Sequence, residues 1–347
     1  MKIRLALGAV VPPPYRDEIA SVCEIIPVGS QHPAGCPTEE ALRQQCRGCE
    51  IVYLGAERVS APTLADWKEH GLRLLGCARS NPVNIDLGAA KELGIPVVYT
   101  PGRNAQSVAE MTIALILVLA RRIALASRRL ADGTLLEAPK AELYQVEEKD
   151  DVIWKSRKVF VRDVVPQGIE LYGRTLGVVA FGAIGSRVAR LGLAFGMDVL
   201  AYDPFCPRET IEQAGAKAVS LEELLARSDV VSLHLPVNKE TRKSVNMEWF
   251  SRMKSTAVLI NTARAALVDQ QALVEALEQG TIAGAALDVM WEEPCPANHP
   301  LLQMDQVVIT PHIGGWTDGV ERWQSRMIVE EILRYARGEA PVRVWKR

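Results

Sequence analysis

Three polar residues in the C-terminal half of the sequence, Arg264, Glu293 and His312, have side chains suited to oxidising or reducing the carbon beside a carboxylate. An arginine can bind a carboxylate through two parallel hydrogen bonds. A histidine can exchange a proton with the oxygen atom that is oxidised or reduced. A glutamate can orient the imidazole and stabilise its charged form. This chemistry also requires a hydride carrier, and therefore a second binding site in the chain.

The segment from residue 176 to residue 203 has the pattern of a dinucleotide-binding unit. A hydrophobic run leads into the turn Gly182-Ala-Ile-Gly185, a helical pattern follows, and a second hydrophobic run ends at Asp203. Gly182 lets the backbone approach a pyrophosphate, Gly185 lets the helix pack closely on the strand, and the first amides of the helix point towards the phosphates. Asp203 accepts hydrogen bonds from the ribose and repels a 2′-phosphate, so the sequence predicts NAD rather than NADP.

One residue departs from the glycine pattern of such turns. Ala180 stands where the first glycine is usual, at a position where the chain turns tightly. We expect the methyl group to be tolerated provided that the φ angle stays negative.

Short hydrophobic runs alternate with helical patterns, which predicts α/β domains with parallel sheets covered by helices on both faces. Before residue 101 the expected strands are 3–8, 51–54, 72–77 and 96–100, and the expected helices are 39–46, 63–70 and 86–93. After residue 173 the expected strands are 175–181, 198–202, 229–234, 257–261, 284–289 and 307–310. The helices expected there are 184–195, 221–226, 247–252, 270–279 and 317–337, the last with Thr317 as N-cap and Gly338 as its stop.

Two segments lie between these series. A long helix from Ala105 to about Arg129, capped by Asn104, is apolar on most of its circumference, so we expect it to be buried between two domains. Residues 131–168 are charged and weakly patterned, and a connection of this length is usually functional or flexible. They are interpreted either as a solvated excursion or as an arm that embraces a partner subunit or covers a cleft.

The composition is that of a globular protein and argues against binding to nucleic acid or membranes. The 347 residues are 48% apolar and 24% charged, with a formal net charge of −2. No apolar run reaches the roughly 20 residues that cross a bilayer, and the N-terminus is expected to be a first strand rather than a signal peptide. Seven cysteines in such a chain suggest reduced thiols, so a cytoplasmic location is expected.

A cysteine pair raises the question of a metal. Cys46 and Cys49 have C-x-x-C spacing, and His32 and Cys36 lie upstream. A zinc site is conceivable there, but the chain has no second C-x-x-C pair. The alternative is a helix end that runs into the strand at 51–54, and we expect no bound metal.

Nine ordered phrases make the chain resemble the D-isomer-specific 2-hydroxyacid dehydrogenases over nearly its whole length. They lie at residues 84–86, 94–102, 108–112, 182–185, 234–236, 261–264, 284–289, 293–294 and 310–315. The resemblance implies two Rossmann-like parallel-sheet domains with an active site in the cleft. A discontinuous, flavodoxin-like substrate domain (1–104 and 317–347) would be interrupted by an NAD-binding Rossmann domain (105–316).

The resemblance also implies roles for individual residues. Arg264 corresponds to the arginine that binds the substrate, Glu293 to the partner of the histidine, and His312 to the acid–base catalyst. Asp288 corresponds to the aspartate near the nicotinamide carboxamide, although a buried aspartate at a strand end can also cap a helix. The expected cofactor-binding positions are Thr112, Gly182, Ala183, Ile184, Gly185, Asp203, Leu235, Pro236, Thr262, Asp288 and Gly314.

The residues expected to bind the substrate differ from those usual in the family. The loop whose amides would bind the substrate carboxylate is often glycine-rich, whereas here it contains Arg79, Ser80, Asn81 and Pro82. Pro82 would stiffen this loop, and Arg79 is placed to meet a second anionic group such as a phosphate. Ala265 replaces the glycine that usually follows the catalytic arginine.

These features predict an NAD-dependent enzyme, expected to be a homodimer, that interconverts a D-2-hydroxy acid and its 2-oxo acid. The resemblance fits a 3-phosphoglycerate dehydrogenase-like enzyme, and the alternative is a glyoxylate or hydroxypyruvate reductase. The sequence ends at Arg347 without the regulatory tail of phosphoglycerate dehydrogenases, so feedback control by serine is not expected. An NADH-sensing corepressor-like binding protein, a different class on the same fold, would keep the same three polar residues.

Overall fold

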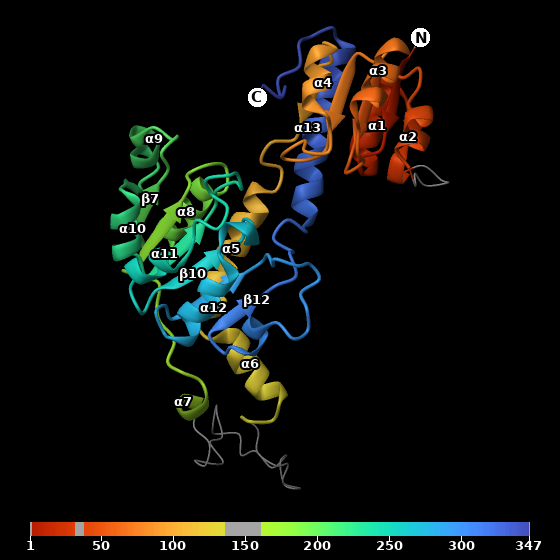
Figure 1. Cartoon of the computed structure of the whole chain (residues 1–347). Helices are drawn as coiled ribbons and strands as arrows, with labels where there is room; N and C mark the ends of the chain where they lie inside the picture. The colour runs from red at the N-terminus through yellow and green to blue at the C-terminus, as the bar shows by residue number, and fades with distance from the viewer. Residues whose placement is uncertain (1, 32–37, 136–160, 347) are drawn as a thin grey trace, which may run out of the picture. The chain divides into compact units, whose positions relative to one another are not determined.

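The computed structural model describes residues 2–31, 38–135 and 161–346 (Figure 1). The chain forms two compact units, of which unit 1 comprises Met1–Ser107 and Gly315–Arg347, and unit 2 comprises Val108–Gly314. Most of the expected arm or excursion at 131–168 lies outside the described residues, as do His32 and Cys36.

Unit 1 is built on a five-stranded parallel sheet with the order β2-β1-β3-β4-β5. Its strands are β1 (Ile3–Leu7), β2 (Cys23–Pro27), β3 (Ile51–Leu54), β4 (Leu74–Cys77) and β5 (Val97–Tyr99). Its helices are α1 (Pro13–Val22), the 3-10 turn η1 (Gly29–Gln31), α2 (Glu39–Gln45), α3 (Ala61–Glu69), α4 (Leu87–Glu92) and α13 (Asp318–Ala336). The strand order reverses between β1 and β3, and sheets of this kind usually bind ligands beyond the carboxyl ends of their strands.

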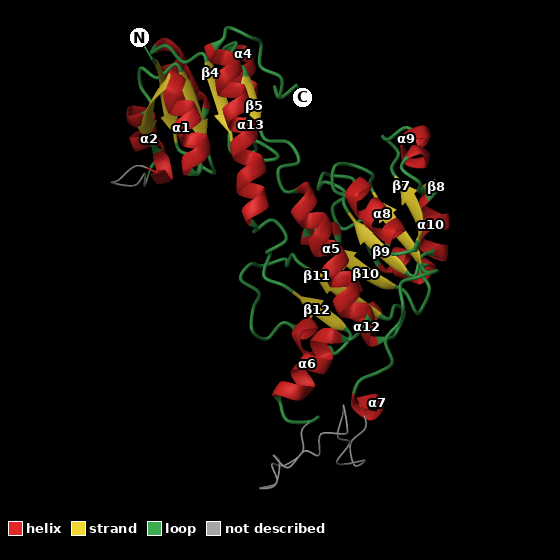
Figure 2. Cartoon of the chain, turned by 180° about the vertical axis from the view of Figure 1, so that it is seen from behind, coloured by secondary structure: helices red, strands yellow, loops and turns green. Residues whose placement is uncertain are grey.

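Helices cover both faces of this sheet (Figure 2). On one face, Ile19 of α1 and Ile328 of α13 belong to one hydrophobic cluster with the strands. On the other face, Leu42 of α2 and Leu64 and Trp67 of α3 belong to a second cluster. Because both faces are buried, the central strands are continuous hydrophobic runs, which is why they can be predicted from the sequence.

Unit 2 contains a seven-stranded parallel sheet with the order β12-β11-β10-β9-β6-β7-β8. Its strands are β6 (Thr175–Val179), β7 (Asp198–Tyr202), β8 (Lys217–Ala218), β9 (Val230–Leu233), β10 (Val258–Asn261), β11 (Gly284–Leu287) and β12 (Val307–Ile309). The helices of this part of the chain are α5 (Ala105–Ala120), α6 (Ile123–Ala131), α7 (Val161–Val164), α8 (Gly185–Ala194), α9 (Arg208–Gln213), α10 (Leu221–Arg227), α11 (Met247–Arg252) and α12 (Gln270–Glu278), with 3-10 turns η2 (Ala265–Leu267) and η3 (Pro300–Gln303).

This second sheet is also covered on both faces. Ile116 of α5 and Val188 of α8 are buried in one hydrophobic cluster. Phe250 of α11 and Leu273 of α12 are buried in the other. The expectation of two α/β domains with parallel, Rossmann-like sheets is confirmed.

Apart from the helix expected at 105–129, the expected strands and helices are present with shifted ends. Among the described residues, the elements that were not predicted are helices α1, α7 and α9, strands β2 and β8, and the 3-10 turns η1, η2 and η3. Helix α1 follows Pro12 and begins with two more prolines, which suggest a loop in the sequence but suit the first turn of a helix. Strand β2 lies at the sheet edge and is only partly buried, so its hydrophobic pattern is weak.

The single helix expected from Ala105 to about Arg129 is wrong. Helix α5 ends at Ala120, and α6 starts at Ile123 after Arg122 adopts a left-handed φ of 54°. The carbonyl of Ala120 accepts a hydrogen bond at 2.9 Å from the backbone N–H of Ile169. A segment distant in the sequence therefore occupies a carbonyl near the helix end, and no local pattern could have indicated this contact.

The predicted ends of α13 are confirmed in position. Thr317 is the N-cap residue, although its side chain makes no capping hydrogen bond. Gly338 has a φ of +71°, a conformation that ends helices and that glycine adopts without steric penalty.

Candidate active site

The expected catalytic residues of unit 2 follow the carboxyl ends of three neighbouring strands. Arg264 follows β10, Glu293 follows β11, and His312 follows β12. These strands pair in parallel, with Asn261 opposite Leu287 and Leu287 opposite Ile309. Because parallel strands end at the same edge of a sheet, three residues that are far apart in the sequence come together there.

His312 and Glu293 form a hydrogen-bonded pair. The Nδ1 atom of His312 lies 2.8 Å from Oε2 of Glu293, and both side chains are 43% exposed. The other carboxylate oxygen, Oε1, accepts a hydrogen bond from the backbone N–H of Met290 at 3.1 Å. Since Glu293 engages Nδ1, the free Nε2 atom is the one that can exchange a proton with a reactant.

Opposing effects act on the pKa of Glu293, and their balance lowers it. Partial burial raises this pKa, but the hydrogen bonds from His312 and Met290 and the positive charges of His312 and Arg264 outweigh it. Glu293 is therefore ionised near neutral pH. The negative charge of this carboxylate therefore lies directly against Nδ1 of the imidazole.

Arg264 is exposed, and its short loop is hydrogen-bonded to the side chain of a buried asparagine. The Nδ2 atom of Asn261 donates to the carbonyl of Arg264 at 2.9 Å, and its Oδ1 atom accepts from the N–H of Ala263 at 3.0 Å. Ala265 starts the 3-10 turn η2 and has no positive φ, so this position does not need a glycine. Asn261 supports the loop, a role that the sequence analysis did not assign to it.

Asp288 holds the loop that carries His312. Its carboxylate, in a residue that is 2% exposed, accepts hydrogen bonds from Oγ1 of Thr310 (2.6 Å) and from the N–H groups of Ile313 (2.9 Å) and Gly314 (2.7 Å). His312 itself has a φ of 57°, a rare conformation for a residue with a side chain. The helix-cap interpretation of Asp288 is wrong, because the carboxylate organises the histidine loop.

The glycine turn after β6 has room for a dinucleotide phosphate. A Cβ atom added to Gly182 would meet no atom within 4 Å, whereas one added to Gly185 would lie 2.0 Å from the carbonyl oxygen of Ala180. Gly182 and Ala183 are exposed at the start of α8. The first amides of a helix lack partners within that helix, so they can bind an anion here.

Asp203 lies at the end of β7 beside this turn. Its Oδ2 atom accepts a hydrogen bond from the N–H of Phe181 at 2.8 Å, and its Oδ1 atom accepts one from Phe205 at 2.9 Å. An ionised carboxylate has about four acceptor positions, so two remain for ribose hydroxyls. The turn and the acid therefore fit the pyrophosphate and the ribose of NAD.

Ala180 does not keep the negative φ that the sequence analysis required of it. Its φ is 74°, which is in the left-handed region. The backbone adopts this conformation because Gly185 packs directly against the Ala180 carbonyl and the N–H of Ala180 bonds to Tyr202 at 2.8 Å. The turn keeps the shape that a glycine would give, and the alanine methyl is strained.

We therefore expect Ala180→Gly to stabilise unit 2. Relief of left-handed strain, about 1–2 kcal/mol, exceeds the extra entropy of glycine in the unfolded chain, leaving a net gain of about 0.5–1 kcal/mol. Thermal and denaturant unfolding of the full chain would measure it. The matched control is Ala183→Gly, at a position without a positive φ, which should not stabilise. If the two substitutions changed the free energy of unfolding equally, the strain assigned to Ala180 would be contradicted.

Other expected cofactor positions also line this edge of the sheet. Leu235 and Pro236 follow β9, and the hydroxyls of Thr112 and Thr262 lie 2.9 Å apart in the interior. Burial lowers the pKa of the neighbouring His234 to about 3, so this histidine stays neutral and does not compete with His312 as a proton donor.

The expected substrate loop belongs to unit 1. Arg79, Ser80 and Asn81 follow β4, and Oγ of Ser80 donates to Oδ1 of Asn104 at 3.2 Å. This contact joins the loop after β4 to the loop after β5.

Two other features concern metals and membranes. Within the described ranges there is no cluster of three or more metal-binding side chains, and both Cys46 and Cys49 are buried. None of the helices that the structure describes combines the length and apolar character needed to span a bilayer.

The sequence matches a known family model over much of unit 2. Residues 113–314 match the model of the NAD-binding domain of D-isomer-specific 2-hydroxyacid dehydrogenases. Over 332 residues (95% of this chain), it is 36% identical to the D-3-phosphoglycerate dehydrogenase of Methanocaldococcus jannaschii, but it spans only 57% of that longer protein. It is also 37% identical to the glyoxylate reductase of Aeropyrum pernix, with 88% of this chain and 85% of that protein aligned.

Solved structures show the same architecture. The structure of D-lactate dehydrogenase with NAD⁺ from Lactobacillus jensenii is 26% identical, with a TM-score of 0.77 and complete coverage of both chains. The similarity therefore extends over both units.

Proposed function

The chain belongs to the D-isomer-specific 2-hydroxyacid dehydrogenase family, and we propose that it is an NAD-dependent enzyme that interconverts a D-2-hydroxy acid and its 2-oxo acid. The main support is the pairing of His312 with the ionised Glu293 at 2.8 Å, close enough to Arg264 for its charge to lower the pKa of Glu293. In this proposal unit 2 (Val108–Gly314) is the NAD-binding domain, and unit 1 is the substrate domain.

The cofactor would be held by the backbone at Gly182–Gly185 and by Asp203, where the structure has an open turn and spare acceptor positions. NAD, when bound, accepts the hydride in oxidation, and its reduced form donates it in reduction. The other proposed contacts are Thr112, Leu235, Pro236, Thr262, Asp288 and Gly314.

In the reducing direction, Nε2 of His312 donates its proton to the carbonyl oxygen of the 2-oxo acid. Arg264 binds the carboxylate and stabilises the negative charge that develops on that oxygen. Glu293 orients the imidazole of His312 through Nδ1, and Asp288 holds the histidine loop in its strained conformation. The overall reaction in this direction is 2-oxo acid + NADH + H⁺ → 2-hydroxy acid + NAD⁺.

A panel of 2-oxo acids tests this activity. NADH oxidation would be measured with glyoxylate, hydroxypyruvate, phosphohydroxypyruvate and pyruvate, and at least one should be reduced rapidly. In the reverse direction only the D-hydroxy acid should react. The relatives named above include both a phosphoglycerate dehydrogenase and a glyoxylate reductase, so the panel also chooses between these substrate types. NADH binding without turnover on any acid would instead favour a binding protein.

The proposed cofactor preference depends on Asp203. We expect Asp203→Asn to weaken NADH and improve NADPH, changing the ratio of their kcat/KM values by about 10–100-fold, because the repulsion of a 2′-phosphate and a charged acceptor are lost. Asparagine keeps an acceptor for the N–H of Phe181 or Phe205. Asp198→Asn, at the exposed start of the same strand, is the control. If the ratio of the kcat/KM values for NADH and NADPH did not change in Asp203→Asn, Asp203 would not determine the cofactor preference.

We also propose a cytoplasmic homodimer. The described cysteines form no disulfide bonds among themselves, which suits a reducing compartment. Light scattering on the purified full chain would give the oligomeric state, and a monomer at micromolar concentration would contradict the dimer.

A further inference from the structure

Two arginines of unit 1 follow the carboxyl ends of adjacent strands. Arg79 follows β4 and Arg103 follows β5, and the two strands pair with Cys77 opposite Tyr99. The loops that carry the two arginines therefore begin at the same edge of the sheet, where parallel α/β sheets bind their ligands. Of the two, Arg79 is predicted from the sequence to bind the substrate, whereas no sequence pattern indicated Arg103.

The Arg103 side chain is held by a neutral partner. Its Nη1 atom donates to Oε1 of Gln324, a residue of α13 that is 6% exposed. The Nε2 atom of Gln324 donates in turn to the carbonyl of Val10, at 3.2 Å. This chain of contacts fixes the guanidinium without neutralising its charge.

The two positive charges lack acidic partners. Among the described residues, neither Arg79 nor Arg103 takes part in an ion pair. Burial and the nearby charge of Arg79 lower the pKa of Arg103 below its usual value. Two like charges at a partly desolvated position repel each other, and an anion between them would remove that repulsion.

A buried hydroxyl lies in the same loops. Thr100 is fully buried, and its Oγ1 atom has no hydrogen-bond partner within the described part of the chain. The N–H of Thr100 donates to the carbonyl of Arg79 at 3.1 Å, and its carbonyl accepts from the N–H of Arg103 at 3.4 Å. Thr100 therefore links the backbones of the two arginines. Unsatisfied buried hydroxyls are unfavourable and often mark a site that binds a ligand or water.

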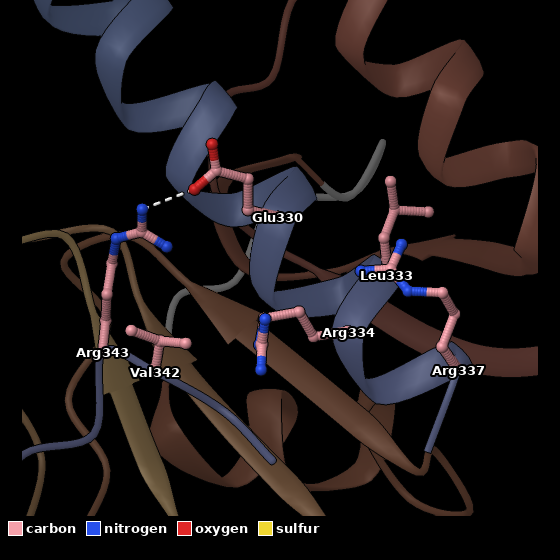
Figure 3. A pocket seen from close by; sticks show the side chains of 6 residues that line it. All are labelled: Glu330, Leu333, Arg334, Arg337, Val342 and Arg343. Atoms are coloured by element: carbon pink, nitrogen blue, oxygen red, sulfur yellow. Dashed lines mark hydrogen bonds and ion pairs between the residues drawn. The ribbon is translucent and has the colours of Figure 1, made fainter. Parts of the chain in front are cut away.

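The arginines beside the end of α13 differ in this respect. A hollow beside the end of α13 is rich in arginine (Figure 3), but its charges are balanced. Arg343 pairs with Glu330 and Glu331, and both Arg334 and Arg337 pair with Glu339. The charges in this hollow are therefore paired, whereas Arg79 and Arg103 form no ion pair with any residue that the structure describes.

We propose that Arg79 and Arg103 bind a second anionic group on the substrate, a phosphate ester or a second carboxylate at the end remote from the 2-oxo acid, and that Arg103 determines this specificity. The guanidinium fork matches the paired oxygens of either group. The inference rests on the proposed dehydrogenase function, which it narrows to dianionic or trianionic substrates.

The kinetic test compares 2-oxo acids that carry a second anionic group with one that does not. Steady-state NADH oxidation would be measured with hydroxypyruvate, phosphohydroxypyruvate and 2-oxoglutarate. In Arg103→Gln the ratio of kcat/KM for the doubly anionic substrate to that for hydroxypyruvate should fall about 10–100-fold, mainly through KM, because a charged hydrogen bond is lost. The phosphate and carboxylate arms show which anion the site prefers.

Three variants separate specificity from folding. Glutamine at position 103 keeps an amide donor for Gln324, and the Arg79 side chain makes no hydrogen bond or ion pair with the described residues, so both variants should fold. Arg58→Gln is the control, since it removes one exposed positive charge from the same unit. An unchanged substrate ratio in both Arg79→Gln and Arg103→Gln would overturn the proposal, as would an equal loss in Arg58→Gln.

A binding measurement makes the test independent of turnover. Inorganic phosphate should raise the unfolding temperature of the wild-type chain and of Arg58→Gln, but should have a smaller effect on Arg103→Gln. If no 2-oxo acid is reduced but this difference is found, the proposed function fails and the anion site stands. If the acids are reduced but phosphate acts equally on all the chains and the substrate ratio is constant, the function stands and the anion site fails.

Discussion

Replacement of His312 by alanine should lower the turnover number by about 10²–10⁴-fold while changing the affinity for NADH by less than about 2-fold. The reason is that the variant loses the proton donor that Glu293 orients, whereas the glycine turn and Asp203 are untouched. Stopped-flow single turnovers would measure the chemical step, and NADH fluorescence would measure binding.

Two variants test whether the loss reflects proton transfer. Glu293→Gln keeps a hydrogen-bonding side chain next to Nδ1 but removes the negative charge, so we expect a smaller loss of turnover than in His312→Ala, because the imidazole is still present and still oriented. His70→Ala, an exposed histidine at the end of α3, is the control. Near-normal turnover in His312→Ala would refute the assigned role.

The second large effect is expected at Arg264. In Arg264→Gln the value of kcat/KM should fall by about 10²–10³-fold, because the variant loses both the bidentate carboxylate contact and the charge near the developing oxyanion. Both kcat and KM should change. Because the arginine is exposed and, among the described residues, donates only to the adjacent Ala263 carbonyl, the fold should persist.

Guanidine rescue would separate the chemical role of Arg264 from a structural one. Added guanidinium should restore part of the activity of Arg264→Gln but none of the activity of His312→Ala. Arg264→Lys should retain more activity than the glutamine variant and less than wild type, because it keeps the charge but loses the planar fork. Equal activity of the lysine variant and the wild type would mean that the charge alone matters.

The two parallel sheets could be predicted because their strands are buried on both faces. A strand such as Ile51–Leu54, with every residue buried, is a short hydrophobic run between polar segments, and the same holds for Val230–Leu233. The edge strand Cys23–Pro27 is only partly buried, and its pattern was too weak to recognise. The break near Arg122 depends on a hydrogen bond from Ile169 to Ala120, which no local pattern contains.

The candidate site also has features that could be predicted from the sequence and features that could not. By itself, the sequence determined which residues have the required chemistry, because Arg264, Glu293, His312 and Asp203 follow recognisable strand and turn patterns. Only the tertiary structure decided how these residues are held, because the contacts that hold them join separate strands. Asp288 binds three groups of the histidine loop, Ala180 takes a positive φ, and Arg103 meets Gln324 from α13. Such contacts depend on how elements pack, whereas the chemistry of a side chain depends on its type alone.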